Sequence, residues 1–372
     1  MILRNDDEKY MRLALNLAAK GEGRVSPNPL VGAVIVKNGK IIGKGWHREF
    51  GGLHAERNAL ADIKEDAAGA VMYVTLEPCC HYGKTPPCTE AILTSGIKRV
   101  VIGCIDPNPL VAGNGIAILQ KAGIEVKTGV LTAECEALNR IFFHYIKTQK
   151  PYVIMKYAMT MDGKIATASG ESRWITGEAA RRHTHKSRGK YSAIMVGVGT
   201  VLADDPALTC RIEGGRNPLR IVCDTNLRTP LDSRIVRTAA AVPTLIATSC
   251  TEQERQQPYI AAGCKMLAVP KAGKSLDLQA LMSELGKAGI DSILLEGGSA
   301  LNFSALQSGI VNHVQAYIAP KLLGGKTAKT PIGGKGIQNL NSCARLYEMR
   351  LQNLGEDILI EGEVKPCVHG IS

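Results

Sequence analysis

Apolar residues in this chain recur with two spacings that alternate along the sequence. In its first half, short β-branched runs such as Val31–Val36, Val71–Thr75 and Arg99–Ile102 are separated by segments whose apolar positions fall three or four residues apart. The segments with helical spacing include Asp7–Lys20 and Ala133–Lys147. Regular alternation of strands and helices predicts a layered α/β domain.

The alternation begins again after Pro151, which follows the charged segment Lys147–Lys150 and cannot continue a helix. A new strand-like run starts at Tyr152, and two β-rich segments near the end, Ala344–Leu351 and Asp357–Glu363, predict an antiparallel pair. Further strand-like runs lie at Ala193–Val196, Arg220–Cys223, Thr244–Ala247, Ser292–Leu295 and Val314–Ile318. We therefore predict a first domain over residues 1–147, a linker over 148–150, a second α/β domain over 151–366 and a tail over 367–372.

The composition is that of a globular protein. Hydrophobic residues make up 45% of the 372 positions, and no apolar run approaches the roughly 20 residues of a membrane helix. The segment Met1–Glu8 turns acidic at once and lacks the apolar core of a signal peptide. We expect a cytoplasmic protein with no membrane partner. In that compartment its 11 cysteines would be reduced thiols or metal ligands rather than disulfides.

The net charge of +11 suits either nucleic acid or a phosphorylated small molecule and cofactor. Basic residues never occur more than two in a row, and aromatic residues are only 4% of the chain, which is poor material for stacking bases. We predict a phosphorylated small-molecule substrate and no nucleic-acid partner.

A histidine and two cysteines in the first half have the spacing of a metal site. His54 opens a segment of helical periodicity, so His54 and Glu56 lie in a first helical turn, where residues two apart can face one site. Cys79 directly follows a β-rich run, and Cys88 begins another helix. One imidazole and two thiolates leave a fourth tetrahedral position for water, as in a catalytic zinc site.

Glu56 gives this site a proton carrier that is not itself a ligand. The order H-x-E followed by P-C and a second cysteine is the signature of zinc deaminases, although eight residues separate Cys79 from Cys88 where nucleic-acid deaminases usually have two. Two alternatives share the ligands: a tRNA deaminase with an RNA-binding second domain, and a non-catalytic zinc scaffold. The first predicts a short cysteine spacing and an aromatic-rich appendage, and the second does not require Glu56.

Two polar residues follow the first cysteine ligand. Adjacent side chains rarely bind one metal in a tetrahedral site, so we interpret Cys80 as a neighbour of the metal. His81 is either a substrate contact or a solvated loop histidine.

Taken together, these residues resemble the family of bifunctional riboflavin-biosynthesis enzymes, in which a pyrimidine deaminase is fused to a reductase. The motifs of the deaminase half are Ser26–Gly32, His54–Glu56, Thr75–Cys79 and Thr85–Cys88, and those of the reductase half are Lys156–Ile165 and Leu295–Gly298. The likeness covers nearly the whole chain and includes the wide cysteine spacing. One departure is Cys80, where the family usually has serine.

The resemblance implies a cytidine-deaminase-like three-layer α/β/α domain followed by a dihydrofolate-reductase-like α/β domain. It implies two reactions on one phosphorylated intermediate. The first releases the 2-amino group of 2,5-diamino-6-(5-phosphoribosylamino)pyrimidin-4(3H)-one as ammonia, and the second reduces the ribosyl unit to ribityl with NADPH. We expect Asn28 to bind the amide edge of the ring, although an Asn between two prolines is also a common turn former.

Without the resemblance, the second half shows no Rossmann or Walker motif, because position 202 is Leu where G-x-G-x-x-G after Gly197 requires glycine. Its most suggestive segment is Leu294–Leu301, a strand, two glycines and a helix start, where bare amides suit a diphosphate. By the resemblance, NADPH is held by Ala158, Trp174, Thr200, Asp204, Gly297, Gly298, Ser299, Ala300, Leu301, Asn302, Phe303 and Ser304. The ribosyl phosphate is faced by Ser172, Arg188, Leu208, Arg211 and Glu296, with the two arginines forming a fork for the phosphate.

Lys156 lies in the strand of the first reductase motif and could protonate or polarise the sugar as it accepts hydride. Side chains alternate between the two faces of a strand, and a lysine in a strand is usually a solvated residue. Lys156 is therefore either a proton donor or a solvated side chain. We also expect the chain to form a homo-oligomer.

Overall fold

A computed structural model describes residues 3–83 and 85–365. The chain divides into two compact units, Met1–Gln149 and Lys150–Ser372. The tail predicted over 367–372 lies outside the described residues, as does position 366. Over the described part of the chain, no helix is long and apolar enough to cross a membrane.

The first unit is built on a five-stranded sheet with the order β2-β1-β3-β4-β5. β1 pairs with β2 and β3 in antiparallel fashion, whereas β3, β4 and β5 run parallel. Their bounds are Gly32–Lys37 for β1, Lys40–Trp46 for β2, Val71–Leu76 for β3, Arg99–Cys104 for β4 and Glu125–Lys127 for β5. The parallel strands end at the same edge, where loops and helix starts can gather.

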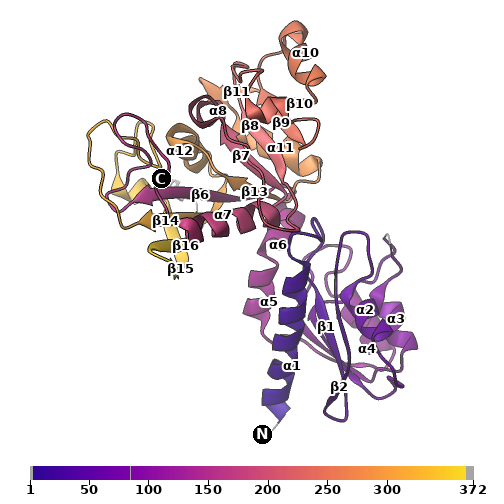
Figure 1. Ribbon diagram of the computed structural model, residues 1–372. Coiled ribbons are helices and arrows are strands. Elements are labelled where there is room, and N and C mark those ends of the chain that lie inside the picture. The colour runs from indigo at the N-terminus through magenta and orange to yellow at the C-terminus, as the bar shows by residue number, and fades with distance from the viewer. Residues whose placement is uncertain (1–2, 84, 366–372) are drawn as a thin grey trace. The chain divides into compact units, whose positions relative to one another are not determined.

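Helices cover both faces of this sheet (Figure 1). α1 and α5 lie on one face, and α2, α3 and α4 lie on the other. Their bounds are Leu3–Ala18 for α1, Ala55–Ala61 for α2, Cys88–Thr94 for α3, Asn114–Lys121 for α4, Thr132–Leu138 for α5 and Arg140–Thr148 for α6, with a short 3-10 turn at Ala19–Gly21. The three-layer α/β/α architecture predicted for this half is confirmed.

Glycines let the two helical layers approach the sheet. A Cβ on Gly32 would lie 2.0 Å from the Ala14 carbonyl oxygen of α1, and a Cβ on Gly45 would lie 2.2 Å from the Ala59 amide nitrogen of α2. Gly45 pairs with Ala33, the neighbour of Gly32, so the two glycines face opposite sides of the sheet. Neither position has room for a side chain.

Two elements of this unit differ from the sequence-based expectation. The strand β2 was not predicted, because its glycines weaken the β-pattern. The helix expected over 133–147 is two helices, α5 and α6, which meet at Asn139. The buried Asn139 amide accepts from the Leu30 nitrogen at 2.8 Å and donates to the Leu30 oxygen at 2.9 Å. This tertiary contact breaks the helix and fixes the loop that follows Asn28.

The second unit contains a nine-stranded sheet with the order β10-β9-β8-β7-β13-β6-β14-β16-β15. The strands from β10 to β14 in this order are parallel, and β16 and β15 complete the sheet in antiparallel fashion. Their bounds are Tyr152–Thr160 (β6), Ala193–Gly197 (β7), Leu219–Cys223 (β8), Thr244–Thr248 (β9), Lys265–Ala268 (β10), Ser292–Leu295 (β13), Val311–Ala319 (β14), Arg345–Leu354 (β15) and Asp357–Lys365 (β16). The final antiparallel pair agrees with the sequence pattern.

Helices pack on both faces of this sheet as well. Leu281 of α11 and Ala305 of α12 belong to the core on one face, and Val201 of α8 and Tyr259 of α10 belong to the core on the other. The bounds are Glu178–Lys190 (α7), Val198–Asp204 (α8), Arg234–Arg237 (α9), Gln253–Ala261 (α10), Leu278–Lys287 (α11) and Ser299–Gln307 (α12), with a 3-10 turn at Leu340–Ser342. A small hairpin, β11 (Lys271–Ala272) with β12 (Ser275–Leu276), follows β10.

Candidate active sites

The three predicted metal ligands meet at the edge where the parallel strands of the first unit end. Their ligand atoms lie within 4.8 Å of one another, and in the described part of the chain no other set of three or more His, Cys, Asp or Glu residues is this close. His54 precedes α2 in an extended conformation, Cys79 follows β3, and Cys88 begins α3. The His54 Nδ1 atom lies 3.4 Å from the Sγ atoms of both Cys79 and Cys88.

These distances and donor types fit a zinc ion. With Zn–S bonds of about 2.3 Å and a Zn–N bond of about 2.0 Å, nitrogen and sulfur ligands of a tetrahedral site lie about 3.5 Å apart. The hydrogen bond from Cys88 lowers the pKa of the Cys79 thiol to about 4, and the His54 imidazole acts in the same direction. Cys79 is therefore held as the thiolate, the form that binds metal.

Glu56 lies in the first turn of α2 and is buried, with 3% of its surface exposed. Burial raises the pKa of Glu56 to about 7, and the negative charge of Cys79 adds to this rise. A dication at the three ligands would lower the pKa of this carboxyl again. Glu56 is thus a buried carboxyl group close to the ligands that can carry a proton.

A cavity of about 330 Å³ opens beside the ligands. Among its lining residues are Asn28, Glu56 and His81, all of which were predicted from the sequence. His81 is half-buried, and its Nδ1 atom is buried without a hydrogen-bond partner. An unpaired buried nitrogen on a cavity wall can be satisfied by a ligand.

His47, which was not predicted, also lines this cavity. Its Nδ1 atom lies 3.0 Å from the Leu53 carbonyl oxygen, and its Nε2 atom lies 3.1 Å from the Asn28 Nδ2 atom. Because a carbonyl only accepts, Nδ1 carries the proton and Nε2 accepts from Asn28. Burial lowers the pKa of His47, which favours this neutral form. One N–H of the Asn28 amide is therefore donated to His47, and the Asn28 oxygen remains for another donor.

Glu77 is a second residue whose role was missed. Its buried carboxylate accepts hydrogen bonds from the backbone nitrogens of Asp106 at 3.3 Å, Gly113 at 3.0 Å and Ile116 at 3.2 Å. These bonds attach the start of α4 to the segment that carries Cys79. The approach is so close that a Cβ on Gly115 would lie 2.2 Å from the Pro78 oxygen.

The second unit has a larger cleft of about 770 Å³. Segments that follow β7, β8 and β13 line it, as expected where parallel strands end. The predicted residues that line it are Ser172, Thr200, Asp204, Gly298, Ser299, Ala300, Leu301 and Ser304. Those outside its lining are Ala158, Trp174, Gly297, Asn302, Phe303, Lys156, Arg188, Leu208, Arg211 and Glu296.

The cleft fits a phosphorylated dinucleotide. Three basic residues line it, Arg228, Lys274 and Lys329, against one acidic residue, Asp204. The start of α12 has no side-chain cap at Gly298, so its first backbone amides are available to a diphosphate.

Lys156, Arg188 and Glu296 form a charged cluster in the same unit. Arg188 donates from Nε to Oε1 of Glu296 at 2.7 Å and from Nη2 to Oε2 at 2.8 Å, and its Nη1 donates to the Thr209 oxygen at 3.3 Å. Burial alone would raise the pKa of Glu296, but Arg188 outweighs it and lowers that pKa to about 2. Burial lowers the pKa of Lys156, whose Nζ atom lies 5.1 Å from the centre of the Tyr317 ring.

The remaining predicted residues are more scattered. Leu208 is buried, whereas Arg211 is exposed. Trp174 is 62% exposed, with the Arg181 guanidinium 4.7 Å from its ring centre. Asn302 is buried and donates to the Pro331 oxygen at 2.9 Å.

Comparisons with known proteins match both halves of the chain. The model of the RibD C-terminal domain family matches residues 151–360, and that of the cytidine and deoxycytidylate deaminase zinc-binding region matches residues 4–104. The riboflavin biosynthesis protein RibD of Actinobacillus pleuropneumoniae is 57% identical over 355 residues, which cover 95% of this chain and 94% of that protein. This chain belongs to the RibD family.

Solved RibD structures have the same fold over nearly the whole chain. The crystal structure of a diaminohydroxyphosphoribosylaminopyrimidine deaminase/5-amino-6-(5-phosphoribosylamino)uracil reductase from Thermotoga maritima is 37% identical, covers 98% of this chain and 99% of that chain, and has a TM-score of 0.85. Acinetobacter baumannii RibD is also 37% identical, covers 97% of this chain and 99% of that chain, and has a TM-score of 0.88. The family resemblance and the two predicted fold classes are confirmed. RibD proteins are bifunctional enzymes of riboflavin biosynthesis that join a zinc-dependent deaminase to an NADPH-dependent reductase and act on small molecules.

Proposed function

We propose that this chain catalyses two consecutive reactions of riboflavin biosynthesis. The first unit hydrolyses the 2-amino group of 2,5-diamino-6-(5-phosphoribosylamino)pyrimidin-4(3H)-one, and the second reduces the ribosyl side chain of 5-amino-6-(5-phosphoribosylamino)uracil to ribityl with NADPH. The observation that carries the proposal is the meeting of the three metal ligands next to a cavity of about 330 Å³, which His54, Cys79 and the buried Glu56 carboxyl line.

In the deaminase, His54, Cys79 and Cys88 would hold the zinc ion. Zinc, when bound, lowers the pKa of a water molecule toward 7 and so supplies a nucleophile at neutral pH. The Glu56 carboxylate would take a proton from the attacking water and pass it to the departing amino nitrogen. Its burial beside the ligands supports this role.

Asn28 and His81 would orient the pyrimidine. Because the Asn28 amide nitrogen donates a hydrogen bond to His47, Asn28 presents Oδ1 to a ring N–H. The unpaired Nδ1 atom of His81 can take a second polar group of the substrate. Both contacts place the amino-bearing carbon relative to the metal rather than take part in bond breaking.

In the reductase, Gly297 to Ser304, Thr200 and Asp204 would hold NADPH, with Ala158 and Trp174 beside them. Ser172, Leu208 and Arg211 would face the ribosyl phosphate. Arg211 is exposed and can turn to the phosphate, whereas Arg188 already donates hydrogen bonds to Glu296 and Thr209. We therefore propose that Arg188 shapes the substrate site mainly through Glu296.

Lys156 would supply a proton to the sugar as hydride arrives from the cofactor. Burial lowers the pKa of its ammonium group, so this lysine releases a proton more readily than a surface lysine. Glu296 keeps a negative charge near Lys156.

A one-pot assay of the purified full chain tests both activities. Ammonia release is followed with and without NADPH, and NADPH oxidation is followed in parallel. Ammonia without cofactor, followed by NADPH consumption as product forms, is the expected result. Ammonia without any NADPH oxidation would refute the reductase assignment, and no ammonia from zinc-loaded protein would refute the deaminase assignment.

We also propose that the chain forms a homo-oligomer and works in the cytoplasm, where metal-binding thiols stay reduced. The outer strand β15 supports self-association, because Tyr347, Met349 and Leu351 are exposed on it. Light scattering during gel filtration measures the mass directly, and a monomer at all concentrations would refute the oligomer.

For the domain limits, residues 1–147 and 151–366 remain our proposal, and expressing each range separately tests whether it folds by itself.

A further inference from the structure

The segment between the two cysteine ligands of the first unit is long. Eight residues separate Cys79 from Cys88, and the last two of them are prolines. A longer connection has more conformational freedom, and a proline has no N–H with which to hold the backbone in place. Contacts from outside the segment are therefore required to keep Cys88 in place beside Cys79.

Arg57 makes such a contact. Its Nε atom donates to the Pro86 oxygen at 3.2 Å, and its Nη2 atom donates to the Pro87 oxygen at 2.8 Å. The side chain is half-buried, and among the described residues no carboxylate forms an ion pair with it. Hydrogen bonds from a charged donor are stronger than those from a neutral one. The guanidinium group thus holds the two carbonyls that directly precede Cys88.

The first turn of α2 places Arg57 next to the reacting groups. His54 precedes this helix, Glu56 lines the cavity, and Arg57 is the next residue. Successive side chains on a helix point about 100° apart. Glu56 is therefore directed to the cavity, while Arg57 is directed to the segment before α3. One helical turn carries both the proton carrier and the contact that holds the second thiolate ligand.

The segment that Arg57 holds is also part of the cavity wall. His81 and Thr85 line the cavity, and the Thr85 Oγ1 atom lies 3.5 Å from the His54 Nε2 atom. A further contact joins the segment to α3, where the Tyr82 hydroxyl donates to a carboxylate at 2.6 Å. Because Tyr82 is 72% exposed, water competes for that bond. The position of this wall therefore depends mainly on Arg57.

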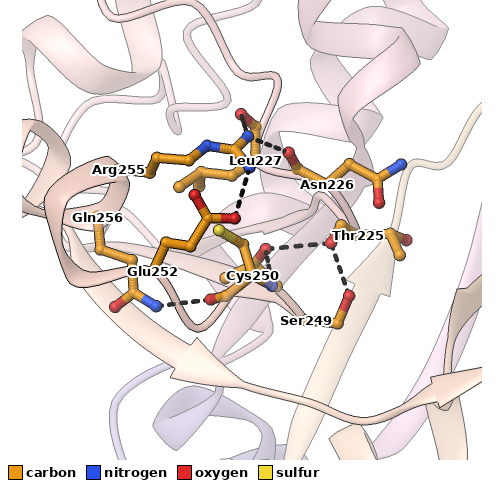
Figure 2. A network of polar contacts seen from close by, with 9 residues as sticks. Thr225, Asn226, Leu227, Ser249, Cys250, Glu252, Arg255 and Gln256 are labelled. Carbon is orange, nitrogen blue, oxygen red and sulfur yellow. Dashed lines mark hydrogen bonds and ion pairs between the residues drawn. The ribbon is translucent and has the colours of Figure 1, made fainter.

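The second unit holds a turn in the same way (Figure 2). Arg255 Nη2 donates to the carbonyl oxygens of Asn226 at 2.8 Å and Leu227 at 3.4 Å. An arginine that binds two successive carbonyls is thus used twice in this chain to fix a turn. Arg255 therefore provides a matched control in the other unit.

We propose that Arg57 is a positioning residue of the deaminase. Through the two proline carbonyls it fixes the Cys88 ligand and the part of the cavity wall that carries His81. The inference rests on the proposed deaminase function and adds to it a residue outside the cavity lining that controls the site. Removing an outer contact of this kind typically changes metal affinity or activity by about 10- to 100-fold.

The variants Arg57→Met and Arg57→Lys of the full chain test the effect on the metal ligands. Methionine keeps an apolar stem and removes both donors, whereas lysine keeps the charge on a single nitrogen that cannot form the fork. Zinc release to a chelating indicator should be about 10- to 100-fold faster in Arg57→Met and intermediate in Arg57→Lys. The cobalt-substituted variants should show shifted visible absorption bands, since these bands depend on the geometry of the ligands.

Steady-state ammonia release gives a second readout. In Arg57→Met the cavity wall loosens while Glu56 keeps its place in α2. The KM for the diaminopyrimidine ribosyl phosphate should therefore rise about 10-fold, and kcat should fall by a smaller factor. A merely structural role would lower the melting temperature of the unit without changing the cobalt spectrum or KM. If Arg57→Met does not fold, Arg57→Lys is measured in the same way.

Two controls separate this role from a general loss of positive charge. Arg255→Met removes the equivalent contact from the second unit and should leave zinc release, the cobalt spectrum and KM unchanged. Arg12→Met removes an exposed charge from α1 of the first unit and should also leave all three unchanged. Both variants lose the same guanidinium group as Arg57→Met.

The proposal is overturned if Arg57→Met releases zinc at the wild-type rate with an unchanged cobalt spectrum, or if either control variant reproduces its effects. A wild-type chain that holds zinc but releases no ammonia would refute the proposed deaminase function. Zinc release and the cobalt spectrum would then still decide whether Arg57 positions the ligand. Faster zinc release, a shifted spectrum and a raised KM in Arg57→Met, with both controls like the wild type, support the proposal.

Discussion

Replacing Glu77 with glutamine should destabilise the deaminase unit and loosen its metal. In the native chain, Glu77 Oε2 accepts from the nitrogens of Asp106 and Gly113, and Oε1 accepts from that of Ile116. Glutamine has nearly the same shape but only one accepting oxygen. Its best orientation keeps two of these bonds and turns its NH₂ group against the third donor, so two donors face each other in a buried site.

The size of the effect follows from these bonds. Losing one hydrogen bond to a charged acceptor costs about 1.5 to 3 kcal/mol, and each bond that becomes neutral loses roughly another 1 kcal/mol. The sum is about 4 kcal/mol. For a unit of this size, about 1 kcal/mol shifts the melting temperature by roughly 2 to 4 °C, so the expected fall is roughly 10 °C.

Scanning calorimetry of the zinc-loaded full chain measures this effect, and a metal indicator follows zinc release in parallel. Glu136→Gln makes the same chemical change at an exposed site on α5 and should alter stability by less than about 0.5 kcal/mol. Binding of NADP⁺ by the second unit should be unaffected in both variants. A loss below about 1 kcal/mol for Glu77→Gln, or equal effects of the two substitutions, would show that Glu77 does not hold α4 to the Cys79 segment.

Three further predictions follow from other contacts. Glu56→Gln should retain zinc and NADPH oxidation but slow ammonia release by about 100-fold or more, because it removes the proton carrier; metal analysis and the two assays check this. Burial alone would lower the pKa of His313, but hydrogen bonds to Glu361 and Glu363 outweigh it and raise that pKa. Protonated His313 therefore stabilises the folded state, and this stabilisation is complete below pH 6.5 and is lost as the pH rises through the higher pKa of the folded state. The free energies of unfolding of wild type and His313→Gln, measured with urea, should converge at high pH. Arg220 is fully buried and donates to carbonyl and hydroxyl oxygens, so Arg220→Met should cost about 3 to 5 kcal/mol in thermal unfolding of the second unit, and a loss below about 1 kcal/mol would contradict it.

Local chemistry made the deaminase site predictable. His54, Cys79 and Cys88 each stand at the start of a helix or the end of a strand, and such positions can be located from hydrophobic periodicity. Zinc binding requires particular side chains at those positions, so residue type and spacing together carry the signal.

Residues that act through a distant partner could not be found in this way. His47 matters because it orients Asn28, and Glu77 matters because it accepts from backbone nitrogens of a helix start that is 39 residues away at Ile116. Neither contact leaves a local pattern. The same reason explains the helix break at Asn139, whose side chain pairs with the backbone of Leu30.

The reductase cleft was less predictable because it depends on strand order. The hydrophobic pattern locates β6, β7 and β13 one by one, but it does not reveal that β13 lies between the other two. That order brings the loop after Leu295 between the segments that follow Gly197 and Thr160. Parallel strands can be ordered in many ways with nearly the same burial of apolar residues. The position of Glu296 beside both Lys156 and Arg188 is therefore a property of the tertiary fold, whereas its occurrence before two glycines is a property of the sequence.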